Sequence, residues 1–172
     1  MDGDDRVIHV GSFSKVLAPS LRLAYVIMPR ALRRDFITAK RLADLGCPAV
    51  DQAALAGFIN APGLDRHVQR VVTNLKERRD ALLAGLARHT TRQLEVFDSS
   101  AGMHVVARLR HGSPSREEAL VARAAGASLG IYPLSGHYAR SPQYGLLLGY
   151  AGVSPRQIGA ACRVLGTCLA GL

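Results

Sequence analysis

Four polar residues near the amino terminus carry side chains suited to chemistry: Ser12, Ser14, Lys15 and Arg22. Together they supply two hydroxyls, an amine and a guanidinium within one short stretch. The residues that follow Lys15 (residues 16–18) are apolar, so its amine is expected to be partly removed from water and to lose some of its affinity for a proton. Lys15 is therefore a candidate for amine chemistry.

Two apolar segments must position these residues. Residues 6–10 are rich in β-branched side chains and precede Gly11, and residues 21–28 are closed by Pro29. Both segments are typical of buried β-strands. Because ligands of α/β sheets usually bind at strand ends, we expect the polar residues between the two strands to line a ligand site.

The middle of the chain is predicted to be helical. Residues 30–45 form an amphipathic segment that ends at Gly46, and Asp51 is suitably placed to cap a helix over residues 52–59. Leucine and valine then recur at helical spacing through residues 64–88, which predicts one long helix. Such a helix, roughly 37 Å long at 1.5 Å per residue, can join two subdomains.

The last part of the chain mixes strands with helices, which indicates an α+β subdomain. The predicted elements are a hairpin of strands 94–97 and 103–109 around a turn at 98–102, a helix opened by a Ser115–Glu118 capping box, strands 131–134 and 145–150, and a final helix opened by a Ser154–Gln157 capping box. The fold class is thus α/β, with a sheet fragment over residues 1–60, a linking helix over 61–90 and a small α+β domain over 91–172.

Composition excludes several classes of protein. Hydrophobic residues make up 48% of the chain, enough for a core, but no apolar run is long enough to span a membrane. The three cysteines match no zinc spacing and are expected to be reduced thiols of a cytoplasmic protein. A net charge of +9 would suit a nucleic-acid partner, but the basic residues are spread along helices without interleaved aromatics. We expect no metal, no membrane and no specific nucleic-acid binding.

Three known motifs of enzymes and nucleotide-binding proteins are incomplete or absent in this sequence. Ser12 and Lys15 fit the Ser-x-x-Lys pattern of serine acyl-transfer enzymes, but the companion Ser-Asp-Asn and Lys-Thr-Gly motifs are absent from the sequence. The glycine-rich phosphate loop and the Gly-x-Gly-x-x-Gly fingerprint are also absent. Acyl transfer therefore stays a minor alternative, and nucleotide binding of these two kinds is excluded.

The stretch around Lys15 resembles the lysine segment of class I/II aminotransferases, which are fold-type I pyridoxal-phosphate enzymes, and most of all the aminotransferase-like domain of MocR-type transcriptional regulators. The segments that carry the resemblance are Gly11–Tyr25, Glu77–Leu82, Ala101–His104, Pro133–Tyr138 and Gly145–Ala151. The resemblance covers nearly the whole chain. It implies the C-terminal portion of the PLP-dependent transferase fold, in which residues 1–60 end the large cofactor-binding domain.

The resemblance also implies roles for single residues. Lys15 would form the Schiff base with pyridoxal 5'-phosphate and then act as base and acid in the proton shift. Arg22 would hold the cofactor phosphate through a forked, charge-assisted contact. Ser12, and with it Ser14, would donate hydroxyls to the same phosphate. The implied substrate is an amino acid or an amine, and the implied assembly is a homodimer.

The sequence departs from the family in two respects. The stretch that normally precedes the lysine strand supplies a ring-stacking aromatic and an Asp for the pyridine nitrogen, and none of it is present among these residues, so we expect a fragment that is weakly active or inactive in isolation. In addition, the position at which many members carry a carboxylate-binding Arg is Leu147. An apolar side chain cannot form that salt bridge, which favours a sensor over a metabolic enzyme.

Three functions remain open from the sequence. The first is a transaminase-type domain that acts on an amino acid or amine. The second is the effector-sensing domain of a MocR-type regulator, separated from its DNA-binding module. The third is a remnant without function, which predicts poor solubility because a sheet edge stays exposed.

Overall fold

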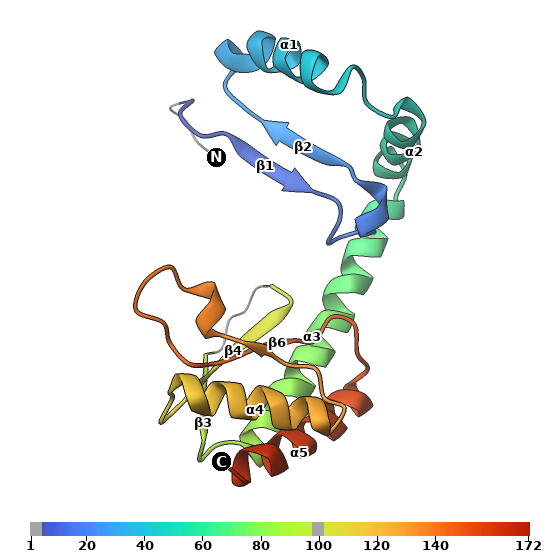
Figure 1. Cartoon of the computed structure of the whole chain (residues 1–172). Helices are drawn as coiled ribbons and strands as arrows, with labels where there is room; N and C mark the ends of the chain where they lie inside the picture. Colours follow the sequence, from blue (N-terminus) through green and yellow to red (C-terminus); the bar gives the residue numbers. More distant parts are fainter. Residues whose placement is uncertain (1–4, 98–101) are drawn as a thin grey trace. The chain divides into compact units, whose positions relative to one another are not determined.

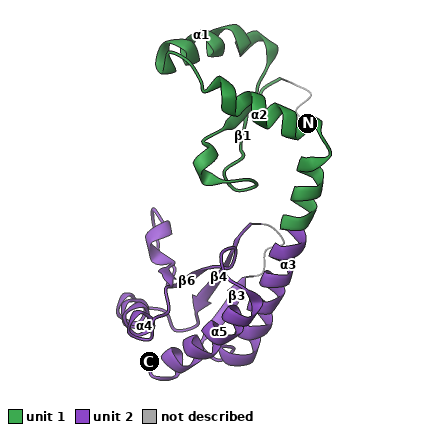
Figure 2. Cartoon of the chain, turned by 90° about the vertical axis from the view of Figure 1, so that its right-hand side faces the viewer, with its two compact units in different colours: residues 1–71 green, residues 72–172 purple. Residues whose placement is uncertain are grey.

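The computed structural model describes residues 5–97 and 102–172. The chain divides into two compact units, residues 1–71 and 72–172 (Figure 2). The boundary falls inside α3 (Gly63–His89), the long helix predicted over residues 64–88. That helix prediction is confirmed, whereas the functional division into segments 1–60, 61–90 and 91–172 stays a prediction.

The first unit begins with an antiparallel hairpin of β1 (His9–Ser12) and β2 (Ala24–Ile27) (Figure 1). The predicted boundaries were wrong, because Gly11 does not break the first strand. It pairs with Tyr25 instead, and the Tyr25 ring lies so close that a Cβ at Gly11 would stand 2.2 Å from Tyr25 Cζ. Glycine is therefore required there to admit the ring.

Three helical segments follow the hairpin. They are η2 (Arg30–Leu32) with α1 (Arg33–Asp44), then α2 (Ala49–Asn60), and then the first turns of α3. Leu45 ends α1 in the left-handed conformation at φ 55°, one residue before the predicted Gly46. The prediction that Asp51 caps α2 was wrong, since Pro48 is the N-cap residue and Asp51 lies inside the first turn, where a carboxylate still complements the helix dipole.

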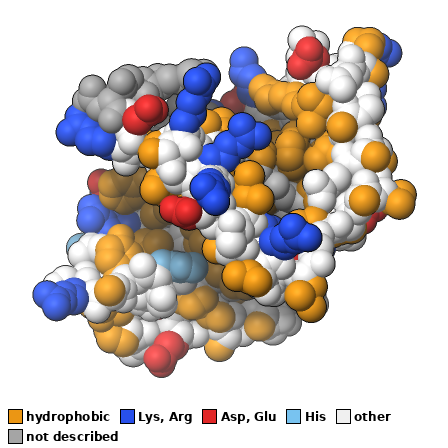
Figure 3. Space-filling model, turned by 90° about the horizontal axis from the view of Figure 1, so that it is seen from above, with side chains coloured by type: hydrophobic (Ala, Val, Ile, Leu, Met, Phe, Trp, Pro, Cys, Tyr) orange, Lys and Arg blue, Asp and Glu red, His pale blue; other side chains and the backbone are white. Residues whose placement is uncertain are grey.

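Apolar side chains of the first unit are unusually exposed. Val10 is 67% exposed and Ile27 is 60% exposed, so the prediction of buried strands was wrong for the residues described. The helices show the same property, with Leu42 at 75% and Leu45 at 92%. Figure 3 shows broad hydrophobic patches at the surface with Lys and Arg side chains between them. A sheet of two strands offers too little area to cover these side chains.

The second unit is built on a four-stranded antiparallel sheet with strand order β3-β4-β6-β5. The strands are β3 (Leu94–Phe97), β4 (His104–Leu109), β5 (Tyr132–Pro133) and β6 (Gly145–Gly149). The predicted β3–β4 hairpin is confirmed, with Leu94 opposite Leu109. The turn expected at 98–102 lies mostly outside the described residues.

One face of this sheet carries the core. Alternate residues Val105, Ala107 and Leu109 of β4 are buried there, as are Leu146 and Leu148 of β6, as expected for a sheet covered on one face. The helices that contribute to the same cluster are the C-terminal half of α3, α4 (Pro114–Gly126) and α5 (Pro155–Ala170) (Figure 1).

The helices α4 and α5 both begin with a serine N-cap whose side chain accepts a backbone hydrogen bond. Ser154 and Gln157 form the predicted capping box of α5, so that prediction is confirmed. The predicted Ser115–Glu118 box was wrong, because Ser113 is the N-cap of α4 and its Oγ accepts a hydrogen bond from the Arg116 amide. Pro114 at the first helical position suits this earlier start. Among the described residues, none of the helices is long and apolar enough to cross a membrane.

Candidate functional site

The connection between β1 and β2 carries the polar residues predicted to form a site. Ser12 is the last residue of β1 and is opposite Ala24, while the Phe13 amide donates to the Leu23 carbonyl at 3.1 Å. The strand pairing thus brings Ser12 and Arg22 to the same end of the hairpin.

Lys15 lies in a short helical turn of this connection. The Phe13 carbonyl accepts hydrogen bonds from the amides of Val16 at 3.2 Å and Leu17 at 2.8 Å, which closes the turn around Lys15. The Ser14 amide donates to Ser12 Oγ at 3.2 Å. Lys15 is exposed, so the expectation that its amine is withdrawn from water was wrong for the described residues.

Arg22 has an uncommon backbone conformation. It ends the 3₁₀ helix η1 (Pro19–Leu21) with φ 51° and ψ 27°, in the left-handed region. A non-glycine residue there costs about 1 kcal/mol, and such positions gather at ligand sites. The guanidinium is exposed, which leaves its fork of donors accessible to an anion.

These residues carry groups whose chemistry suits the aldehyde and the phosphate of pyridoxal phosphate. An amine is available for an aldehyde, and a guanidinium with two hydroxyls is available for a phosphate. Ser12 Oγ already accepts from the Ser14 amide, so its own proton remains free for a further acceptor.

One contact of this connection was not foreseen from the sequence. His67 on α3 lies with its ring Nε2 2.7 Å from the Val16 carbonyl oxygen. The residues are separated by 51 positions, and no local motif signals such a pairing. Helical periodicity alone places His67 on α3 without naming its partner.

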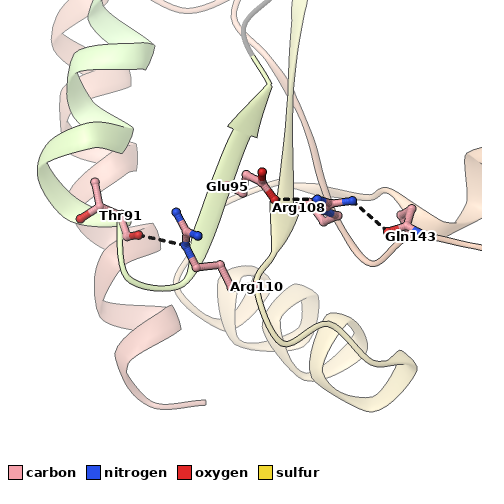
Figure 4. A network of polar contacts seen from close by, with 5 residues as sticks. All are labelled: Thr91, Glu95, Arg108, Arg110 and Gln143. Carbon is pink, nitrogen blue, oxygen red and sulfur yellow. Dashed lines mark hydrogen bonds and ion pairs between the residues drawn. The ribbon is translucent and has the colours of Figure 1, made fainter.

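A polar network occupies the second unit, on β3 and β4 (Figure 4). The Arg108 guanidinium donates to Glu95 Oε2 at 2.7 Å and to Gln143 Oε1 at 3.2 Å. The hydrogen bond and charge of Arg108, with a smaller contribution from Arg110, hold the pKa of the Glu95 carboxyl below its usual value. Cross-strand opposition of Glu95 and Arg108 follows from the hairpin register.

Leu147 lies on β6, where it pairs with Val106 of β4 and Tyr132 of β5. A mostly apolar cavity of about 170 Å³ is lined by Leu147 together with Leu82 of α3 and residues of α5.

Comparison with known proteins identifies relatives of two kinds. Residues 1–165 match the family model for aminotransferase class I and II. The chain is 31% identical over its whole length to an HTH-type transcriptional regulator of Bacillus subtilis, and 34% identical over 91% of its length to a probable rhizopine catabolism regulatory protein, MocR, of Rhizobium meliloti. It is also 32% identical over 96% of its length to a 2-aminoadipate transaminase of Thermus thermophilus.

The chain spans 36%, 31% and 41% of the lengths of these three relatives. Among solved structures, a multiple substrate aminotransferase of Thermococcus profundus matches 99% of this chain with a TM-score of 0.89 at 27% identity, and 42% of its own chain is covered. An α-aminoadipate aminotransferase of Thermus thermophilus, complexed with N-(5'-phosphopyridoxyl)-L-leucine, matches 96% with a TM-score of 0.79 at 30% identity, and 42% of that chain is covered.

These matches confirm the predicted fold class, the PLP-dependent transferase fold, and the predicted resemblance to aminotransferases and MocR-type regulators. The chain therefore belongs to the aminotransferase class I and II family.

Proposed function

We propose that this chain is a pyridoxal-phosphate-dependent aminotransferase-type domain in which Lys15 is the Schiff-base residue. The observation that supports this proposal is the grouping of Lys15, Arg22 and Ser12 on one hairpin connection of a class I and II chain. The family supplies the reaction type, and the connection supplies an amine and a phosphate clamp.

Lys15 would hold the cofactor through Nζ at its aldehyde carbon. Lys15 Nζ would also accept the proton that leaves the substrate α-carbon and return it. When bound, pyridoxal phosphate supplies the electron sink for the bond broken at that carbon.

Arg22 and the two serines would hold the phosphate. The exposed guanidinium presents paired N–H donors to phosphate oxygens. Ser12 and Ser14, which begin the connection, would add hydroxyl donors to the same phosphate. This arrangement anchors the cofactor through its charged end and leaves Lys15 to the aldehyde.

The proposed substrate is an amino acid or an amine. Because Leu147 is apolar and borders an apolar cavity, we propose that no carboxylate is held at that position. A substrate amine without a carboxylate would lose nothing there, whereas an amino acid would need its salt bridge from another residue.

The second candidate is the cofactor- or effector-sensing domain of a MocR-type transcriptional regulator. The two regulator relatives favour it. In that role the domain would bind cofactor and amine without completing transamination. A homodimer and a cytoplasmic location belong to either proposal.

The experiment is reductive trapping of the 172-residue chain with pyridoxal phosphate and borohydride, repeated with pyridoxal, which lacks the phosphate. We expect pyridoxal phosphate to modify Lys15 at a lower concentration than pyridoxal does. Arg22→Met should raise the half-saturating concentration of pyridoxal phosphate about tenfold, the typical effect of losing one charge-assisted contact, and should leave pyridoxal unchanged.

Arg30→Met is the matched control, since Arg30 is an exposed arginine of the same unit. Equal trapping by the two aldehydes, or an equal effect of both arginine substitutions, would refute the phosphate clamp. With the clamp established, release of a keto acid or aldehyde from added amines favours the enzyme, and binding without release favours the sensor.

A further inference from the structure

The hydrogen bond between His67 and Val16 joins α3 to the turn that carries Lys15. His67 Nε2 lies 2.7 Å from the Val16 carbonyl oxygen. A carbonyl oxygen can only accept, so Nε2 carries the proton and donates it. The contact is partly buried, which shields it from competing water.

The local backbone explains why the Val16 carbonyl needs a donor from elsewhere. The turn begins in helical geometry at Phe13, and a continuing helix would bring the amide of residue 20 to the Val16 carbonyl. Ala18 is extended instead, with φ −150° and ψ 139°, so the helix stops and this carbonyl is orphaned. His67 supplies the missing donor.

His67 is itself held in place by an aromatic neighbour. The Phe58 ring of α2 meets the His67 ring edge-on, with centroids 6.4 Å apart and planes at 69°. Phe58 in turn lies against Gly63, where a Cβ would stand 2.7 Å from Phe58 Cε2. The junction of α2 and α3 thus restricts where the imidazole can point.

The connection is loosely packed against α2. A hollow of about 470 Å³ is lined by Leu17 and Leu21 of the connection and by Leu55 and Phe58 of α2. Since dense packing is what normally restricts a segment to one conformation, a directional bond at Val16 has more influence on the turn here.

We propose that His67 is a positioning residue for Lys15: by holding the Val16 carbonyl it fixes the turn from which Lys15 projects. This inference rests on the proposed function of Lys15. The hydrogen bond of His67 goes to the backbone of the residue that follows Lys15, so His67 acts on Lys15 through that backbone.

The test compares His67→Leu, which keeps bulk but removes the donor, with His67→Gln, whose amide nitrogen can donate again. Arg66→Leu is the control on the same turn of α3, since Arg66 is exposed. The first readout is amide hydrogen exchange of the peptide over residues 13–17, which needs no cofactor. Exchange of residues 105–109 reports whether the second unit stays folded.

In His67→Leu we expect exchange of residues 13–17 to rise about fivefold, which corresponds to about 1 kcal/mol, the usual value of one hydrogen bond. His67→Gln should recover most of the protection, and Arg66→Leu should match the unchanged chain. The second readout is borohydride trapping with pyridoxal phosphate, in which Lys15 modification should fall by a similar factor in His67→Leu and recover in His67→Gln.

Unchanged exchange in His67→Leu would overturn the proposal. So would faster exchange combined with undiminished trapping at Lys15, because the bond would then be structural only. If the unchanged chain fails to trap at Lys15, the proposed function fails instead, and the exchange arm alone shows whether His67 holds the turn.

Discussion

Glu117 on α4 offers a sharp test of how the second unit is held together. Its side chain is 3% exposed. Oε1 accepts from the amides of Leu134 at 3.2 Å, Ser135 at 3.2 Å and Gly145 at 2.7 Å, and Oε2 accepts from the Ser135 hydroxyl. One carboxylate therefore fastens both ends of the 134–145 segment to α4.

The expected cost of Glu117→Ala follows from the donors it strands. The Gly145 amide is in a buried contact, and a buried donor left without a partner costs about 1–3 kcal/mol. The Leu134 amide keeps the Gly145 carbonyl as an acceptor at 3.0 Å. With the smaller loss from the partly buried Ser135 contacts, we expect a total loss of about 2–4 kcal/mol in the free energy of unfolding. Glu117→Gln keeps one acceptor oxygen and can donate to the Ser135 hydroxyl, so it should cost only about 1–2 kcal/mol.

Urea denaturation followed by circular dichroism measures both values. With a slope of about 2 kcal/mol per molar urea, the alanine variant should lose about 1–2 M in midpoint and the glutamine variant at most about 1 M. Glu118→Ala is the control, because Glu118 is its exposed neighbour and should change stability by less than about 0.5 kcal/mol. If alanine and glutamine at position 117 behave alike, the bonded carboxylate does not hold the segment.

Three further expectations concern the second unit and the thiols. Arg108 lowers the folded-state pKa of the Glu95 carboxyl. The Glu95–Arg108 pair therefore stabilises the fold above the unfolded-state pKa of Glu95, and this contribution is lost as the pH falls through the folded-state pKa. Arg108→Met should raise the Glu95 pKa in an NMR titration, and an unchanged pKa would contradict the role of Arg108. Cys47 is exposed and Cys162 is buried, and burial raises the pKa of the Cys162 thiol. In the folded chain iodoacetamide should therefore modify Cys47 before Cys162, as measured by mass spectrometry. Modification of both thiols at the same rate would contradict the burial of Cys162. A Cβ at Gly85 would lie 2.6 Å from Cys162 Sγ, so Gly85→Ala should lower the free energy of unfolding, measured by urea denaturation, by about 1–3 kcal/mol. Adding Cys162→Ala should relieve this clash and restore stability. A loss that persists in the double variant would place the strain elsewhere.

Elements set by local chemistry could be predicted from the sequence. The α5 capping box needs only Ser154 and Gln157 three residues apart, and both partners occur there. The α4 start was misplaced because Ser113 and Ser115 both resemble caps, and the choice depends on Pro114, which suits the first helical position after Ser113. Where two possible N-cap residues lie within two positions of each other, the backbone geometry determines which of them starts the helix.

Features that depend on distant partners could not be predicted. Glu117 reads as an ordinary first-turn acidic residue of α4, and only the fold shows that it receives amides from the 134–145 segment. His67 is similar, since its partner Val16 lies on another element. The sequence predicts that Gly11 breaks the first strand. The actual reason for glycine there is the Tyr25 ring of the opposite strand, which fills the space that a side chain at position 11 would take.

The candidate site falls between these cases. Lys15, Ser12 and Arg22 were recognisable as a group because they are close in sequence, and the hairpin keeps Ser12 and Arg22 at one end. The exposure of Lys15 was not foreseen, because apolar neighbours at 16–18 suggested burial, whereas the turn directs the chain so that this residue stays accessible.

The decisive measurement is the distribution of trapped cofactor among the lysines of the chain, which are Lys15, Lys40 and Lys76. After incubation with limiting pyridoxal phosphate, borohydride reduction and peptide mapping, Lys15 should carry most of the modification, at least about tenfold more than either other lysine, as one charge-assisted contact would give. That preference should disappear with Arg22→Met. Modification spread evenly over the three lysines, in the chain and in the variant alike, would show that Lys15 is not the Schiff-base residue.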